Sequence, residues 1–219
     1  MPTLFLTGAT GAVGAAIRRH YLSNGWSVAG FSHSDDGFSQ EGYRFWSMNA
    51  SDEAAVEQTF SIASRELGAP RALIATVGGV RSWKTVEETP LEDFRALFEL
   101  NLVTFFLTAK HAFRLMQEEG TVVSIGARPP DAKTSGYAAS KAGVIALTQV
   151  LAEEGKSRRI NANCIVPTII RTKANEEWGD PADFEKWTKP EDIAALCFFL
   201  SSEAGKAVNG AVIRMPNRL

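Results

Sequence analysis

Short apolar runs alternate with longer segments of helical periodicity along almost the whole chain. Seven runs have strand length and are rich in β-branched and aromatic residues: 3–7, 26–32, 43–48, 71–77, 121–126, 161–167 and 211–215. Apolar residues recur at helical spacing over residues 13–23, 52–67, 91–116, 137–154 and 189–202. This order predicts a parallel sheet covered by helices on both faces. We therefore expect one doubly wound α/β domain, a Rossmann fold of about seven strands, over residues 1–219.

Composition excludes several classes of protein. The 23 Lys and Arg residues nearly balance the 25 Asp and Glu residues, which predicts neither a nucleic-acid nor a membrane-surface partner. No apolar run is long enough for a membrane span, and no basic-then-apolar leader precedes Thr3. Cys164 and Cys197 are expected to be buried free thiols, and His20 and His111 lack a second ligand nearby. We expect a cytoplasmic protein without a metal.

Three glycines follow the first predicted strand and open the first predicted helix. Gly8, Gly11 and Gly14 form a GxxGxxG pattern, although a plain tight turn would explain two of them. Dinucleotide sites need such glycines for a tight turn, for close approach of the backbone to a pyrophosphate, and for helix–strand packing. The N-terminus of the helix then offers N–H groups to the phosphates. We predict that Thr10, Ala12 and Val13 contact the dinucleotide together with the glycines.

The end of the second predicted strand bears on the choice of dinucleotide. An acidic residue there binds the adenine ribose hydroxyls of NAD(H), and its absence leaves room for a 2′-phosphate. Ser32 and His33 occupy this position, which favours NADP(H). An inward turn of Asp35 or Asp36 would instead restore NAD(H), and His33 has the alternative of being a solvated loop residue.

Several motifs in this order resemble the short-chain dehydrogenase/reductase family over nearly the whole chain. They are TGATGAVG near the start, Asn101 within the helical segment 91–116, YAASK from Tyr137 to Lys141, Pro167 followed by Thr172, and the PEDIA…FLSS…G ending. Tyr137 and Lys141 are four residues apart and therefore share one helix face. An ammonium group beside the phenol would lower the pKa of the tyrosine, so that Tyr137 gives a proton to the substrate. The resemblance implies that Lys141 also holds the nicotinamide ribose and that Asn101 binds a proton-relay water.

One residue of the family pattern is missing. The serine that hydrogen-bonds the reacting carbonyl in this family corresponds to Ala127, while Ser124 falls earlier, inside the strand. Loss of such a donor typically costs about 10²–10³ in rate. Thr134 or Ser135 could replace it, because the loop between Ala127 and Tyr137 is shorter than is usual in the family.

The dihydropteridine reductase branch of the family lacks this serine as its normal state. The chain resembles that branch in its GxxGxxG pattern, in Gly78 and Gly79 followed by a loop with Trp83, in the GARPPDA loop, and in the segment that ends at Trp187. It departs from the branch in having no aspartate after the second strand and in having Thr168 after Pro167. The resemblance implies a small quinonoid or conjugated acceptor, which needs less polarisation than a ketone.

The family pattern also implies the remaining contacts. Asn49 and Ala50 would lie at the adenine, Gly78, Gly79, Pro167 and Thr172 near the nicotinamide or pyrophosphate, and Ala127, Trp83 and Trp178 at the substrate. Residues 168–189 would form a mobile substrate lid, in which Trp178 or Trp187 has the alternative role of a core anchor. The fourth and fifth helices would pair copies into a homodimer or homotetramer. Two alternative functions remain: a carbonyl or 3-oxoacyl reductase that uses Thr134 or Ser135, and a dinucleotide sensor without turnover.

Overall fold

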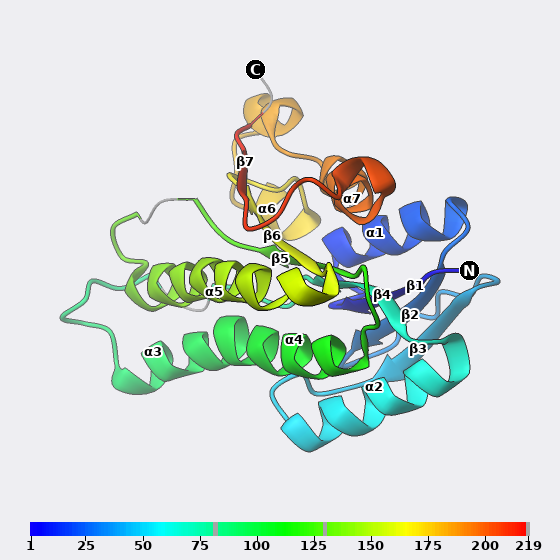
Figure 1. The fold of residues 1–219 in the computed structure, drawn as a ribbon. Helices are drawn as coiled ribbons and strands as arrows, with labels where there is room; N and C mark the ends of the chain where they lie inside the picture. Colours follow the sequence, from blue (N-terminus) through cyan, green and yellow to red (C-terminus); the bar gives the residue numbers. More distant parts are fainter. Residues whose placement is uncertain (81–82, 129–130, 218–219) are drawn as a thin grey trace.

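A computed structural model describes residues 1–80, 83–128 and 131–217 and contains a seven-stranded parallel sheet (Figure 1). The strand order is β3-β2-β1-β4-β5-β6-β7, so the chain reverses its direction of winding between β1 and β4. The strands are β1 (Thr3–Thr7), β2 (Ser27–Ser32), β3 (Tyr43–Ser47), β4 (Pro70–Ala75), β5 (Thr121–Ile125), β6 (Asn161–Pro167) and β7 (Val212–Met215). Ligands of such sheets bind outside the carboxyl ends of the strands, where this reversal opens a crevice.

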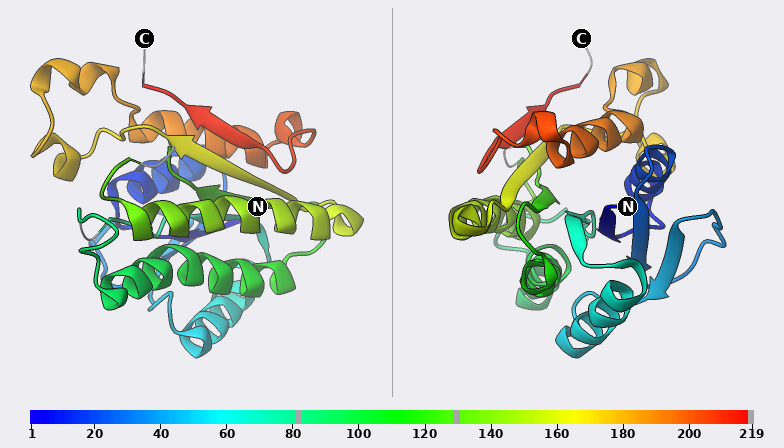
Figure 2. Two further views of the ribbon diagram at one scale, coloured as in Figure 1. Left: turned by 90° about the vertical axis from the view of Figure 1, so that its left-hand side faces the viewer. Right: turned by 45° about the vertical axis from the view of Figure 1, so that its right-hand side comes forward.

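Helices cover both faces of the sheet, as the sequence predicted (Figure 2). The helices are α1 (Ala12–Ser23), α2 (Glu53–Leu67), α3 (Leu91–Phe98), α4 (Thr104–Leu115), α5 (Ser135–Glu154), α6 (Lys173–Glu176) and α7 (Pro190–Ser201). One face packs against α2, α4 and α5, and the other packs against α1 and α7. Among the described residues, no helix is long and apolar enough to cross a membrane.

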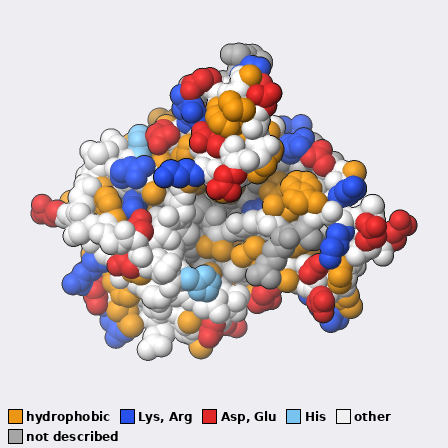
Figure 3. All heavy atoms as spheres, turned by 180° about the vertical axis from the view of Figure 1, so that it is seen from behind, with side chains coloured by type: hydrophobic (Ala, Val, Ile, Leu, Met, Phe, Trp, Pro, Cys, Tyr) orange, Lys and Arg blue, Asp and Glu red, His pale blue; other side chains and the backbone are white. Residues whose placement is uncertain are grey.

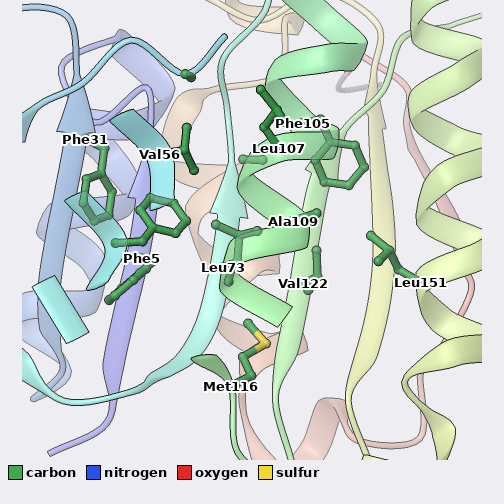
Figure 4. Close-up of a cluster of buried hydrophobic side chains, with 14 of the residues drawn as sticks. Phe5, Phe31, Val56, Leu73, Phe105, Leu107, Ala109, Met116, Val122 and Leu151 are labelled. Atoms are coloured by element: carbon green, nitrogen blue, oxygen red, sulfur yellow. The ribbon is translucent and has the colours of Figure 1, made fainter. Parts of the chain in front are cut away.

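The core has one apolar cluster on each side of the sheet. The first contains Phe5, Phe31 and Phe60, whose rings contact one another, and it continues across Leu73 and Phe105 (Figure 4). The second lies between the opposite face of the sheet and the helices α1 and α7. Because successive residues of a strand point to opposite faces, strands buried on both sides need continuous apolar runs. This is the pattern from which the sequence predicted the fold.

The long helix expected over residues 91–116 is interrupted. It consists of α3, a π-helical turn from Glu99 to Val103, and α4. A π-helical turn holds one extra residue, and such turns are frequent at functional sites. The buried Asn101 lies within this turn. The apolar periodicity continues through the interruption, which is why the sequence predicted a single helix.

The segment between β6 and α7 projects from the body of the molecule (Figure 2). It contains the single-turn α6 and a 3-10 helix from Pro181 to Lys186. Its two ends are joined where Ile170 and Thr188 form a β-bridge. The N-cap of α7 is Lys189, whose N–H donates to Asp192 Oδ2 at 3.0 Å.

Candidate active site

A groove with a volume of about 570 Å³ lies along the carboxyl ends of β1, β2 and β4. Its volume is typical of small-molecule and cofactor sites. Most residues predicted to bind the dinucleotide line it: Gly8, Thr10, Gly11, Ala12, Val13, Gly14, Ser32, His33, Asn49, Ala50, Gly78 and Thr172. The surface is hollowed below the projecting segment in Figure 3. Segments that are distant in the sequence thus meet at the crevice that the topology predicts.

The glycine stretch turns tightly from β1 into α1. Gly8 N–H donates to Phe31 O at 2.8 Å, and a Cβ at Gly14 would lie 2.1 Å from Gly8 O. Only glycine therefore fits at position 14 without moving the turn. No side chain caps the start of α1 at Gly11, and the first turn of α1 contains no acidic residue. The uncapped N–H groups and the positive end of the helix dipole suit a pyrophosphate, so this part of the groove fits a dinucleotide.

The adenine end of the groove presents small polar side chains. Ser32 Oγ accepts a hydrogen bond from Thr10 N–H at 3.3 Å, and His33 and Ser34 extend the same wall. Asn49 is exposed, and its Oδ1 accepts from Ser51 N–H at 3.1 Å, which fixes the turn after β3. This wall therefore offers hydroxyl, imidazole and amide groups.

Neither of the two aspartates after β2 lines the groove. Asp36 accepts two hydrogen bonds from Arg18, at 2.9 and 2.5 Å. Asp35 Oδ1 accepts from Gly37 N–H at 3.0 Å. The inward turn that the sequence left open for Asp35 or Asp36 is therefore not the conformation observed here.

Lys141 is buried on α5, and its Nζ donates to Ile125 O at the end of β5, at 2.9 Å. Burial lowers the pKa of Lys141 to about 8, because the charged form loses its hydration. A Cβ at Gly78 would lie 2.8 Å from Lys141 Nζ and 2.7 Å from Asn101 Oδ1. Gly78 also lines the groove, so Lys141 and Asn101 meet directly behind its wall.

Tyr137 lies one turn before Lys141 on α5 and is half-buried. Burial raises the pKa of Tyr137, and the positive charge of Arg128 opposes that increase. The sequence assigned this opposing charge to Lys141, but the Lys141 ammonium is directed at a carbonyl and is itself disfavoured by burial. Arg128, which forms an ion pair with Asp131, was not recognised from the sequence because nothing in its spacing links it to Tyr137.

Asn101 joins the loop after β4 to α5. Its Oδ1 accepts from Gly79 N–H at 2.9 Å, and its Nδ2 donates to Gly79 O at 3.0 Å and to Ser140 Oγ at 3.1 Å. Ser140 Oγ in turn donates to Tyr137 O at 2.8 Å. The amide of Asn101 therefore holds the glycine loop in register with the helix that carries Tyr137 and Lys141.

Ala127, two residues past the end of β5, provides no hydroxyl at the position of the family serine. Nearby hydroxyls are engaged elsewhere: Ser124 Oγ bonds Thr148 Oγ1 at 2.7 Å within the core, and Thr134 Oγ1 donates to Asp131 O at 2.6 Å. Ser135 Oγ lies 3.5 Å from Thr89 Oγ1, which leaves it the most loosely held of these groups. Pro129 and Pro130 of the loop lie outside the described residues.

Three tryptophans near this region differ in how far they are exposed. Trp83, after the glycine loop, is 63% exposed, and Trp178 in the projecting segment is 64% exposed. Trp187 is buried, and its ring centroid lies 5.7 Å from that of Trp178. Of the two alternatives for this segment, Trp187 is thus the core anchor, and Trp178 lies at the surface.

Some of the predicted contact residues do not line the groove, and some residues that were not predicted do line it. Among the described residues, four predicted cofactor contacts do not contribute to its lining: Gly79, Tyr137, Lys141 and Pro167. The predicted substrate contacts Trp83, Ala127 and Trp178 do not line it either. Pro167 is buried at the end of β6, and Gly79 is turned toward Asn101. The groove gains Met48, Ser34 and Ser51 from the segments after β2 and β3, together with residues of α3 and the π-helical turn. In the described residues, no three His, Cys, Asp or Glu side chains gather to hold a metal ion.

The topology and the groove define a dinucleotide-binding oxidoreductase of the Rossmann class. A family model described as enoyl-(acyl carrier protein) reductase matches residues 8–215. The chain belongs to the short-chain dehydrogenase/reductase family and is an NAD(P)-dependent oxidoreductase.

Relatives in the family act on varied substrates. D-threitol dehydrogenase of Mycolicibacterium smegmatis is 27% identical over 94% of this chain and 88% of its own length. Acetoacetyl-CoA reductase of Paracoccus denitrificans is 27% identical over 97% and 95%. A blue fluorescent protein from a metagenomic library, solved in complex with NADPH, superposes with a TM-score of 0.89 at 26% identity, over 99% of this chain and 96% of that protein. These similarities show the family but leave the substrate open.

Proposed function

We propose that the protein is a reductase that uses NADP(H) in preference to NAD(H) and acts on a small conjugated or quinonoid acceptor, as dihydropteridine reductase does. The observation that carries this proposal is Ala127, which leaves the acceptor side without the hydroxyl that polarises a ketone. Ser124 and Thr134 cannot replace it while their hydroxyls bond Thr148 and Asp131. An acceptor that is already electron-poor needs little polarisation.

The residues have distinct roles in this proposal. The bound dinucleotide supplies the hydride. The first turn of α1 binds the pyrophosphate, and Ser32, His33 and Asn49 hold the adenine half. Tyr137 holds the proton that the reduced acceptor takes up, and Lys141 binds the nicotinamide ribose. Asn101 positions the loop at Gly78 against Lys141 and feeds the proton relay.

The exposed tryptophans favour a flat acceptor. Trp83 and Trp178 belong to the two segments that follow β4 and β6, and each of these segments contributes a residue to the groove, Gly78 and Thr172 respectively. Aromatic faces of this kind stack on planar heteroaromatic rings. We propose that residues 168–189 form a substrate lid in which Trp187 anchors the segment and Trp178 contacts the acceptor.

A second candidate is a carbonyl or 3-oxoacyl reductase. It is favoured by the loosely held hydroxyl of Ser135 and by the relative that reduces acetoacetyl-CoA. In this candidate Ser135 donates the hydrogen bond that Ala127 lacks. Ser135→Ala would then abolish reduction of acetoacetyl-CoA, whereas the same variant leaves the reduction of a quinonoid acceptor unchanged under the first proposal.

The deciding experiment is steady-state oxidation of NADPH and of NADH with quinonoid dihydropterin and with acetoacetyl-CoA. We expect turnover with quinonoid dihydropterin that falls by about 10²-fold or more in Tyr137→Phe. Tyr21→Phe is the matched control, because Tyr21 is buried between α1 and α7 and bonds Ser201. Turnover with acetoacetyl-CoA alone would establish the second candidate. Cofactor binding without turnover on either acceptor would support a dinucleotide sensor.

The proposal extends to assembly and location. Phe106 on α4 and Val150 on α5 are about half exposed and lie beside one apolar groove on that face. We propose that copies pair through these helices into a dimer or tetramer in the cytoplasm, each as one catalytic domain.

A further inference from the structure

The loop between β2 and β3 is clasped to α1 by Arg18. The guanidinium of Arg18 donates from Nη1 and Nη2 to the two carboxylate oxygens of Asp36, at 2.9 and 2.5 Å. The ring of Phe38 covers it, with its centroid 4.0 Å from Arg18 Cζ, and the ring of Tyr43 lies 5.4 Å away. Paired hydrogen bonds of this kind fix the direction of a carboxylate as well as its position. We refer to Arg18, Asp36 and Phe38 as the Arg18 clasp.

The Arg18 clasp holds one of the two acidic groups that follow the adenine end of the groove. Ser32, His33 and Ser34 line the groove, and Asp36 follows only two residues after Ser34. The side chain of Arg18 is 4% exposed, and neither Arg18 nor Asp36 lines the groove. Asp36 Oδ1 also accepts from Phe38 N–H at 3.3 Å within the loop. The carboxylate is therefore held outside the lining of the groove by Arg18 and by the loop backbone.

We propose that Arg18 determines the cofactor preference by withholding Asp36 from the adenine ribose. A carboxylate at the end of the second strand binds the ribose hydroxyls of NAD(H) and repels a 2′-phosphate. With Asp36 held by Arg18, the residues of this wall that line the groove are Ser32, His33 and Ser34, and none of them is acidic. The inference rests on the proposed function, because it concerns which dinucleotide the groove prefers.

Removal of Arg18 and removal of Asp36 have different expected effects on the stability of the protein. Removal of Asp36 alone would leave the buried charge of Arg18 without its partner, which destabilises proteins strongly. Removal of Arg18 leaves Asp36, whose side chain is 31% exposed, free to reach water or the groove. Gly37, which follows it with φ +73°, gives the loop a flexible position for this rearrangement. Arg18→Met is therefore the informative variant.

The test measures dissociation constants of NADPH and NADH, without any acceptor, by quenching of tryptophan fluorescence. In the wild type we expect tighter binding of NADPH. In Arg18→Met we expect the ratio of the NADPH constant to the NADH constant to rise by about tenfold or more, the scale of one hydrogen bond to a charged group. Arg18→Gln, which keeps a polar group in the buried position, should show the same change if Arg18→Met does not fold.

Two double variants test whether the change in the ratio of dissociation constants depends on the carboxylate of Asp36. Arg18→Met with Asp36→Asn should return the ratio toward the wild-type value, since no acid is left to release. Arg18→Met with Asp35→Asn is the matched control and should keep the changed ratio. If Arg18→Met and Arg18→Gln leave the ratio unchanged while both dinucleotides bind, the inference is wrong. A ratio that changes equally with and without Asp36 would also overturn it, because Arg18 would then act on the phosphate itself. Absence of dinucleotide binding by the wild type would instead overturn the proposed function.

Discussion

The candidate active site contains a buried lysine, Lys141, whose charge is disfavoured by its surroundings. Lys141 donates to Ile125 O, and burial lowers the pKa of its ammonium to about 8. At neutral pH the folded protein therefore holds a charge in an environment that disfavours it. A bound dinucleotide brings negative charge to the neighbouring groove, which would favour the charged form of Lys141.

This burial predicts a pH-dependent stability in the absence of cofactor. The ordinary pKa of 10.5 applies to Lys141 in the unfolded chain, and the folded value is about 8. Between these values the unfolded state binds more protons, so the free energy of unfolding rises with pH. We expect wild type to gain roughly 1 kcal/mol relative to Lys141→Met from about pH 7 to pH 9, measured by urea unfolding. The buried thiol of Cys197, whose pKa is raised, is common to both proteins and cancels. A difference that does not vary with pH would contradict the prediction.

The amide of Asn101 predicts a second effect at the residue scale. Asn101→Ala would leave the N–H and the carbonyl of the half-buried Gly79 without their partner and would remove the buried hydrogen bond to Ser140 Oγ. We expect the free energy of unfolding to fall by roughly 1–3 kcal/mol, the cost of unpaired buried polar groups. Chemical denaturation measures the loss. Glu99→Ala, an exposed position of the same π-helical turn, should change stability by less than about 0.5 kcal/mol. Equal losses in the two variants would assign the effect to the turn and not to the amide.

At the scale of elements, the two tryptophans of the projecting segment have different roles. Trp187 anchors the segment, and Trp178 is proposed to contact the acceptor. Trp187 is 3% exposed, and a Cβ at Gly179 would lie 2.1 Å from its Cη2, so the segment folds tightly around that ring. We expect Trp187→Ala to lower the free energy of unfolding by roughly 3 kcal/mol, as for other buried aromatic residues. Trp178→Ala should leave stability within about 0.5 kcal/mol and raise the KM for the acceptor, with an unchanged Kd for NADPH.

Thermal unfolding and steady-state kinetics of the two variants provide this test. If Trp178→Ala leaves the KM unchanged, the segment is no acceptor lid, whatever its role in stability. If Trp187→Ala leaves stability unchanged, Trp187 does not anchor the segment.

The elements differ in how far the sequence could predict them. The strands are continuous apolar runs between polar segments, and their observed ends lie within two residues of the prediction. The π-helical turn was missed because the apolar spacing of residues 91–116 continues across it. The helices of the projecting segment were missed because they are too short to show a period.

The residues of the groove also differ in how far the sequence could predict them. Its glycines and strand-end residues could be predicted, because a parallel sheet brings the carboxyl ends of its strands to one edge. The pairing of Arg18 with Asp36 and the influence of Arg128 on Tyr137 could not, because each depends on how a loop folds against a helix. The direction of Lys141 toward Ile125 likewise depends on the packing of α5 on β5.

At the scale of the whole molecule, α5 connects the site with an unpaired apolar face. Tyr137 and Lys141 lie on its inner side, and Val150 lies on its outer side beside Phe106 of α4. These two residues border a groove of about 410 Å³ whose lining also includes Lys110, Arg114, Glu154 and Arg158. Interfaces between proteins combine apolar and charged groups in this way. A two-fold axis across this face would bury both helices of each copy.

Assembly through α4 and α5 can be tested with a single substitution that introduces a charge. Phe106→Asp places a carboxylate at the centre of the apolar face, and a symmetric interface would bury two such charges. We expect size-exclusion chromatography with light scattering to show a dimer or tetramer for wild type and a smaller species for the variant. Val86→Asp, at a 78% exposed position in the loop before α3, should leave the assembly unchanged.

The same variant links assembly to the active site. Because the outer side of α5 would lose its support, Phe106→Asp should lower the thermal midpoint and the turnover together, and both should recover partly at higher protein concentration. Recovery distinguishes lost pairing from damage within one copy, since internal damage does not depend on concentration. A monomeric wild type, or a variant that assembles as wild type does, would mean that this face serves no pairing of copies and that α5 holds Tyr137 and Lys141 through its contacts within the chain alone.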